Sequence, residues 1–154
     1  MIVIGSDHTG IELKNKIIEY LKLKKVEFFD ATNIKNQEND DYPDRAKDIC
    51  KKVLENNQNI GIAICGTGIG ISISCNKIKN IRAALCNDVY VAEMSRRHNN
   101  ANILCLGART QFVKDLKQVY NIVDVFVNTK FDGGRHQRRI DKISAIENEN
   151  KGNE

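Results

Sequence analysis

The chain has 154 residues, of which 41% are hydrophobic and one is proline, so it is long enough for a single globular domain with a sizeable core. Its net charge of +4 is spread along the sequence, aromatic residues make up only 6%, and tryptophan is missing. A basic stripe interleaved with aromatic residues is therefore lacking, which argues against a nucleic-acid-binding protein and suits a small anionic ligand better.

The N-terminus and the cysteines indicate where the protein works. The opening residues MIVIGSDHTG have no positive segment ahead of an apolar stretch, and no apolar run approaches the roughly 18 residues of a membrane span. The five cysteines include no CxxC pair, and all of them except Cys65 and Cys75 occupy positions that we expect to be buried. We expect a cytoplasmic protein with reduced thiols and no membrane contact.

Short β-branched runs alternate with stretches of helical periodicity along the chain. The runs are MIVIG, VEFF, IGIAIC, IRAALC and ILCLG. Apolar residues spaced by threes and fours predict amphipathic helices over residues 13–21, 46–54 and 113–127, the second of them after Pro43. This alternation is typical of βαβ units and predicts an α/β fold with a parallel sheet of five strands.

The C-terminal part follows a different pattern. The segment FDGGRHQRRIDKI predicts a glycine turn and a basic helix whose isoleucines at 140, 143 and 146 are too few to build a core. We expect this helix to dock elsewhere, for instance on a second subunit. The polar segment 147–154 is predicted to be disordered, which leaves residues 1–146 as one domain.

Polar and glycine residues follow the predicted strands in SDH, CGTGIG, CND and GAR. Ligands of open α/β sheets bind beyond the carboxyl ends of the strands. We therefore expect one rim of the sheet to carry Asp7, His8, Cys65, the loop 66–70, Asn87, Asp88 and Arg109.

The glycine loop leads from a predicted strand into a helix, where successive backbone N–H groups form a cradle for an anion or an oxyanion. A dinucleotide fingerprint would need glycine in place of Ile71, and the Gly-Lys-Ser/Thr of a Walker loop is missing. No nucleotide cofactor is expected. A purely structural turn explains the loop equally well. Its residues are Gly66, Thr67, Gly68, Ile69 and Gly70.

Cys65 directly precedes this cradle, where a helix end and oriented amides favour the thiolate and make the residue a candidate base. A buried apolar cysteine is the alternative. His98 lies in SRRHNNAN before the last strand, from where it is predicted to reach the same rim as an acid or base. A solvated histidine at a helix end is the alternative.

Four arginines offer guanidinium groups to a phosphate. Arg135 and Arg139 are one helical turn apart and can point together, and Arg109 follows a strand. A solvated basic face is the alternative, and we assign Arg138 to it. The histidines lie too far apart in sequence for a recognisable metal-binding spacing, so no metal site is expected.

Six motifs occur in order: GSDHTG, DYPD, ICGTGIGISISCNK, IRAALCND, RRHNNANILCLGAR and FDGGRHQRR. Together they resemble the ribose-5-phosphate isomerase B family, which includes allose- and galactose-phosphate isomerases, over residues 1–146. The resemblance implies a three-layer Rossmann- or flavodoxin-like fold with helices on both faces of the sheet. It also implies a homodimer, or a tetramer, in which the C-terminal helix docks on the partner and the active sites are shared.

The resemblance also implies roles by position. Cys65 would take the proton from substrate C2, Thr67 and the loop amides would stabilise the enediolate, and His98 would assist ring opening. One branch of the family uses a glutamate at the position of Ile71, so this chain fits only the cysteine branch. The implied ligands of the phosphate are His8, Arg109, Arg135 and Arg139, and those of the sugar hydroxyls are Asp7 and Asn99.

The function that this resemblance implies is the interconversion of ribose 5-phosphate and ribulose 5-phosphate, a step of the pentose phosphate pathway, without a cofactor. One alternative is an allose-6-phosphate or galactose-6-phosphate isomerase. Another is a non-catalytic regulator that binds a phosphosugar. A thiol-transfer role is disfavoured because Cys65 has no resolving cysteine at CxxC spacing.

Overall fold

The computed structural model describes residues 1–33 and 40–149. Their centre is a five-stranded sheet in the order β2-β1-β3-β5-β4, and every neighbouring pair of strands is parallel. The predicted parallel sheet is confirmed, with two strands shorter than expected. The strands are β1 (Ile2–Ser6), β2 (Phe28–Asp30), β3 (Ile60–Cys65), β4 (Ala83–Leu85) and β5 (Ile103–Gly107).

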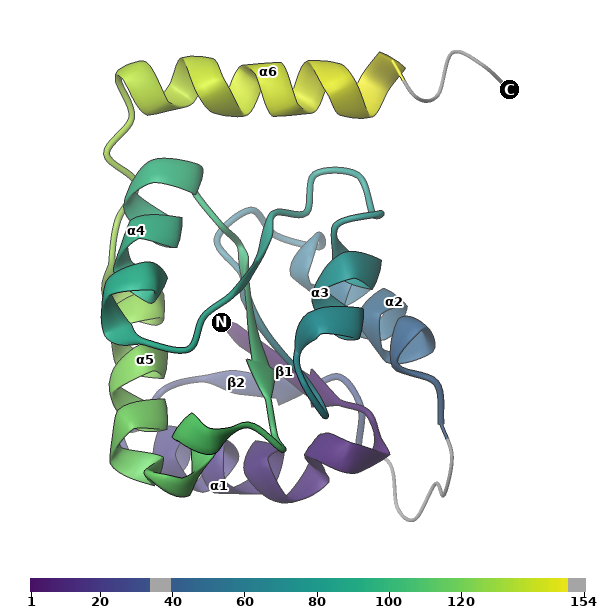
Figure 1. The fold of residues 1–154 in the computed structure, drawn as a ribbon, viewed down its shortest axis with the longest axis vertical. Coiled ribbons are helices and arrows are strands. Elements are labelled where there is room, and N and C mark those ends of the chain that lie inside the picture. The colour runs from purple at the N-terminus through teal and green to yellow at the C-terminus, as the bar shows by residue number, and fades with distance from the viewer. Residues whose placement is uncertain (34–39, 150–154) are drawn as a thin grey trace.

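Helices cover both faces of the sheet, which confirms the three-layer arrangement (Figure 1). The chain reverses its direction across the sheet after β2 and again after β4, and right-handed crossovers place the helices before and after each reversal on opposite faces. One face carries α1 (Ile11–Leu23), α4 (Val89–Asn99) and α5 (Leu116–Asn128), and the other carries α2 (Tyr42–Val53) and α3 (Ile69–Cys75).

Two predicted features differ from the structure. The helix predicted over 113–127 begins only at Leu116, because the Asp115 carboxylate caps it by accepting the Lys117 N–H at 3.1 Å, and η2 (Gln111–Lys114) is a separate 3-10 turn. Cys75, which we did not expect to be buried, has no exposed surface because it packs under α2. No helix among the described residues is long and apolar enough to cross a membrane.

The last helix, α6 (Arg135–Glu149), lies across one end of the molecule beside the C-terminal end of α4 (Figure 1). Ile143 and Ile146 on it are 47% and 59% exposed. The prediction of disorder from residue 147 is wrong for residues 147–149, since the Glu147 carboxylate accepts the Asn80 N–H at 3.1 Å and ties down this end of the helix. The rest of that prediction concerns residues 150–154, outside the described part.

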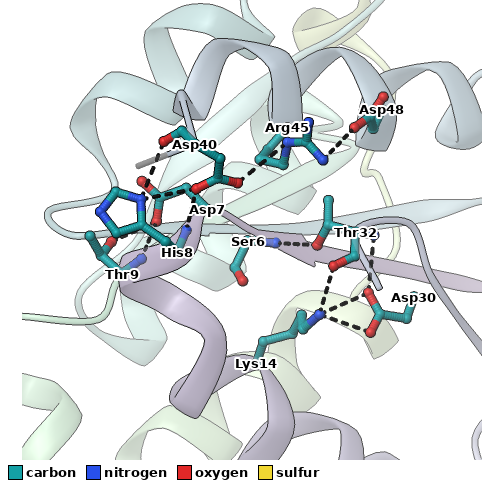
Figure 2. Close-up of polar contacts among 10 residues, drawn as sticks. All are labelled: Ser6, Asp7, His8, Thr9, Lys14, Asp30, Thr32, Asp40, Arg45 and Asp48. Atoms are coloured by element: carbon teal, nitrogen blue, oxygen red, sulfur yellow. Dashed lines mark hydrogen bonds and ion pairs between the residues drawn. The ribbon is translucent and has the colours of Figure 1, made fainter. Parts of the chain in front are cut away.

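A buried ion pair joins α1 to β2 (Figure 2). The Lys14 ammonium, on a residue only 3% exposed, donates to both Asp30 carboxylate oxygens at 3.1 and 2.9 Å and to the Thr32 carbonyl at 3.0 Å. Thr32 in turn accepts the Ser6 N–H at 2.8 Å. The pair therefore fixes the chain beyond β2 against the carboxyl end of β1.

Removing one partner of this pair leaves a charge buried without compensation. We expect Asp30→Ala to reduce the free energy of unfolding by about 3 kcal/mol, measured by urea denaturation. The matched control is Glu12→Ala, which breaks the exposed pair with Lys16 and is expected to leave stability almost unchanged, because solvent screens exposed ion pairs. Equal losses in the two variants would contradict a special role for the buried pair.

Candidate active site

Cys65 ends β3 and is 4% exposed. Its sulfur accepts the Gly68 N–H at 3.2 Å, a contact that stabilises negative charge on sulfur. Next to it the Thr67 hydroxyl oxygen accepts the Ile69 N–H at 3.2 Å. The loop therefore wraps its backbone around the thiol at the start of α3, as the sequence predicted.

The glycines of this loop are required by its shape. Gly68 has φ of 77°, and a Cβ there would lie 2.5 Å from Leu85 Cδ1 and 2.9 Å from the Leu106 carbonyl carbon. A Cβ on Gly70 would lie 2.7 Å from the Tyr42 ring. Only glycine lets the loop approach β4, β5 and α2 this closely, so the cradle is held on three sides.

The ends of β1 and β5 flank the cradle. The Asp7 N–H donates to the Ile64 carbonyl at 3.1 Å, and the Arg109 N–H donates to the Gly66 carbonyl at 2.8 Å. A Cβ on Gly66 would lie 3.6 Å from both Thr9 Oγ1 and Arg109 Cδ. The predicted rim that joins Asp7, Cys65 and Arg109 is confirmed.

Asp7 has a structural task at this rim. Its carboxylate is buried and accepts the Thr9 N–H at 2.9 Å and the Thr9 hydroxyl at 2.6 Å, which caps the short 3-10 turn η1 (His8–Gly10). The capped turn leaves His8 exposed, and Figure 2 shows its ring next to Asp40.

His8 is held by an acid that sequence reasoning missed. Asp40, whose side chain is 5% exposed, accepts the His8 N–H at 2.7 Å and contacts His8 Nδ1 at 2.9 Å, and its other oxygen lies 3.5 Å from Arg45 Nε (Figure 2). The hydrogen bond to Asp40 raises the pKa of His8 above 6.5. The only sequence signal was the position of Asp40 just before the DYPD motif.

His98 does not reach this rim within one chain, which corrects the prediction. It lies in the last turn of α4, just before β5, where the Asn102 carbonyl accepts the Gly61 N–H at the start of β3. Cys65 pairs with Gly107 at the far end of the same two strands. Helices that follow parallel strands run back, so the two residues are separated by a strand length of roughly 15 Å.

A second polar cluster gathers around His98 instead. Its ring stacks on that of His136 with centroids 4.2 Å apart, and Asp132 completes a group whose ligating atoms lie within 4.8 Å of one another. The prediction of no metal site rested on the separation of these histidines in sequence, but the fold brings His98 and His136 next to each other. The predicted residues that belong to this end of the molecule are Asn99, Arg135 and Arg139, all exposed.

Comparison with known proteins gives a consistent result. Residues 2–143 match the model of the ribose/galactose isomerase family. The chain belongs to this family. It is 50% identical over 142 residues to a putative sugar phosphate isomerase of Rickettsia typhi, covering 92% of this chain and 96% of the relative.

Solved structures of the ribose/galactose isomerase family agree with this fold. Ribose-5-phosphate isomerase B of Clostridium thermocellum is 45% identical with a TM-score of 0.88 over 96% of this chain and 97% of its own. The enzyme from Mycoplasma genitalium, with bound ribulose-5-phosphate, is also 45% identical, with a TM-score of 0.87 over 96% of each chain. In this fold Cys65 lies at the carboxyl end of β3, whereas His98 lies near the amino end of β5.

The Asp40 contact makes His8 titrate unusually. The pKa of His8 is raised in the folded state, so the contact between His8 and Asp40 stabilises the fold most when His8 is protonated. This contribution to folding stability is complete below about pH 6.5 and is lost as the pH rises through the folded pKa. We expect Asp40→Asn to lower the His8 pKa, measured by NMR titration of the imidazole. In the control Asp48→Asn, which removes the Arg45 partner that does not contact His8, the pKa should stay raised. An unchanged pKa in Asp40→Asn would contradict the assignment.

Proposed function

We propose that this chain interconverts ribose 5-phosphate and ribulose 5-phosphate, in a homodimer whose two active sites each take residues from both subunits. The observation that carries the proposal is that, within one chain, the proposed base Cys65 and the proposed acid or base His98 lie at opposite ends of the strands. Cys65 and its cradle lie at one edge of the sheet, and His98 lies at the opposite edge. Two copies related by a twofold axis would place the Cys65 edge of each chain against the His98 edge of the other, at two equivalent sites.

The Cys65 edge provides the proton transfer. With the aldose open, the Cys65 thiolate takes the proton from C2, and the electron pair moves through C1 to the carbonyl oxygen, forming an enediolate. Transfer of the hydroxyl proton from O2 to O1, and return of the C2 proton from Cys65 to C1, then give the ketose. Backbone N–H groups of the loop stabilise the charge on oxygen, and the step is balanced without a redox cofactor.

Four basic side chains support the phosphate grip. His8, which Asp40 keeps protonated to higher pH, and Arg109 lie at the cysteine edge. Arg135 and Arg139, one turn apart at the start of α6, come from the partner. A guanidinium group can donate two hydrogen bonds to two phosphate oxygens. The grip therefore holds the substrate by its phosphate, at a distance from the carbons that react.

Exposed apolar surface supports the dimer. Ile69 and Ile73 on α3 are 53% and 55% exposed, although they adjoin the cradle. Ile143 and Ile146 line a cavity of about 750 Å³ between α6 and the segment that leads into β4. A second copy would cover these side chains and give α6 the packing that its own chain leaves incomplete. The free thiols support a reducing compartment such as the cytoplasm.

The substrate itself is testable directly. We expect conversion of ribose 5-phosphate in the presence of EDTA, measured beside allose 6-phosphate and galactose 6-phosphate. The structure of the M. genitalium relative with ribulose-5-phosphate favours the pentose. Preference for a hexose phosphate would keep the mechanism and change the substrate, whereas binding without turnover of any of the three would favour a regulator.

The shared site predicts complementation between two inactive variants. We expect Cys65→Ala and His98→Ala each to lose turnover, because each lacks one group in both sites. After subunit exchange in an equal mixture, half the dimers are mixed, and one of their two sites is intact, so about one quarter of wild-type activity should return.

Two controls define this result. Mixing Cys65→Ala with Thr67→Ala, whose substitution lies at the same edge, should give no more activity than the two variants show separately, since every site then contains a substituted Cys65 edge. Absence of recovery in the first mixture, with subunit exchange verified by mass spectrometry, would show that the site is not shared.

A further inference from the structure

The stacked pair His98–His136 has no role in the proton transfer described above. His136 is the second residue of α6, is 7% exposed, and lies flat against His98 with 4.2 Å between ring centroids and 9° between their planes. Such close parallel contact between rings from two different helices fixes both orientations. His98, at the end of α4, is the more exposed of the two.

The turn before α6 builds this contact. Gly133 and Gly134 have φ of 67° and 54°, and no atom lies within 4 Å of a Cβ built on either. Glycine is needed there for the backbone conformation and not for space. The turn brings the His136 N–H to the Gly133 carbonyl at 3.1 Å and places the ring over His98.

An ionised acid lies beside the two rings. The Asp132 carboxylate accepts Arg97 Nε–H at 3.1 and 3.2 Å, and the Asp132 N–H donates to the Arg97 carbonyl at 3.0 Å. The hydrogen bond from Arg97 lowers the pKa of Asp132. Burial, and then the charges of His98, Arg135 and Arg139, lower the pKa of His136.

The arrangement suits a proton better than a metal ion. A metal needs the nitrogen lone pairs to converge, but lone pairs lie in the ring planes, and these planes are parallel. Asp132 already accepts both hydrogen bonds from Arg97. Two stacked imidazolium ions would repel each other, so the pair takes one proton easily and a second one only with difficulty.

We propose that His136 is a positioning residue that stays neutral, holds the His98 ring in place by stacking, and leaves the single proton of the pair on His98. The proposal rests on the proposed function and on the role in ring opening that the family resemblance implies for His98. Asp132 faces both rings from the turn, Arg97 extends from α4, and Arg135 and Arg139 extend from α6. Buried His136 would lose the most solvation if it were charged, so the proton belongs on His98.

Two variants separate stacking from protonation. His136→Phe keeps a flat ring without a titratable group, and we expect it to keep kcat for ribose 5-phosphate within about threefold of wild type. His136→Ala removes the ring, and we expect kcat to fall by about tenfold or more because His98 loses its orientation. A kcat as low in His136→Phe as in His136→Ala, or an unchanged kcat in His136→Ala, would overturn the proposal.

Exchange of substrate protons with solvent shows which step of the reaction the His136→Ala substitution slows. Ribulose 5-phosphate, which is already open, exchanges a C1 proton with deuterium through the enediolate and the Cys65 base alone. At saturating ketose we expect His136→Ala to keep this exchange within about threefold of wild type. Loss of exchange in parallel with net conversion would mean that the substitution damages the Cys65 step, against the proposal.

NMR titration of the imidazoles tests the pairing without turnover. In wild type we expect two coupled steps, with His136 titrating below 6.5. In His136→Phe the coupled steps should disappear. The control Ile140→Ala removes a buried side chain of α6 that is not part of the stack, and should keep the coupled steps. Independent titration in wild type would overturn the pairing, whereas coupled titration in a protein that converts no sugar phosphate would overturn only the proposed function.

Discussion

Parallel strand pairing is the constraint on which the rest of this structure depends. All five strands point the same way, so every residue that follows a strand reaches one edge, and every residue that follows a helix reaches the other. Cys65 and Arg109 belong to the first set, His98 and Arg135 to the second. Loops of this length cannot carry a side chain across the sheet. A chemistry that needs both sets therefore favours an assembly of two chains.

The cysteine edge is rigid for reasons of packing. Gly68 lies against β4 and β5, Gly70 lies against Tyr42, and Lys14 and Asp30 hold the chain beyond β2. Each contact comes from a different element, so the cradle cannot shift without moving the sheet or the helices on it. An oxyanion site gains from such rigidity, because donors that are already in place need not reorganise during the reaction.

Much of this arrangement could be predicted from the sequence, because local patterns encode it. Strand runs and glycine positions placed Cys65 and the cradle correctly, and the spacing of Arg135 and Arg139 predicted their shared helix. The predicted position of His98 was wrong because a residue that precedes a strand lies at the amino end of that strand, whereas the rim with Cys65 lies at the carboxyl ends. Asp40 was missed because its contact with His8 spans a separation of 32 residues and no pattern marks it. His136 was left without a role for the same reason, since stacking depends on a turn geometry that only the structure reveals.

The glycine turn before α6 has a mechanical consequence. A helix of 15 residues is about 22 Å long, so a rotation of about 10° at Gly133 and Gly134 would swing its far end by about 4 Å. Arg135, His136 and Arg139 lie close to the pivot and would hardly move, while Ile143 and Ile146 would travel farthest. Once the hydrogen bonds between Glu147 and Asn80 are released, the helix would act as a lever whose charged groups stay nearly fixed while its apolar end adjusts to the surface it meets. Sequence drift at that surface could then be accommodated without disturbing the groups near the pivot.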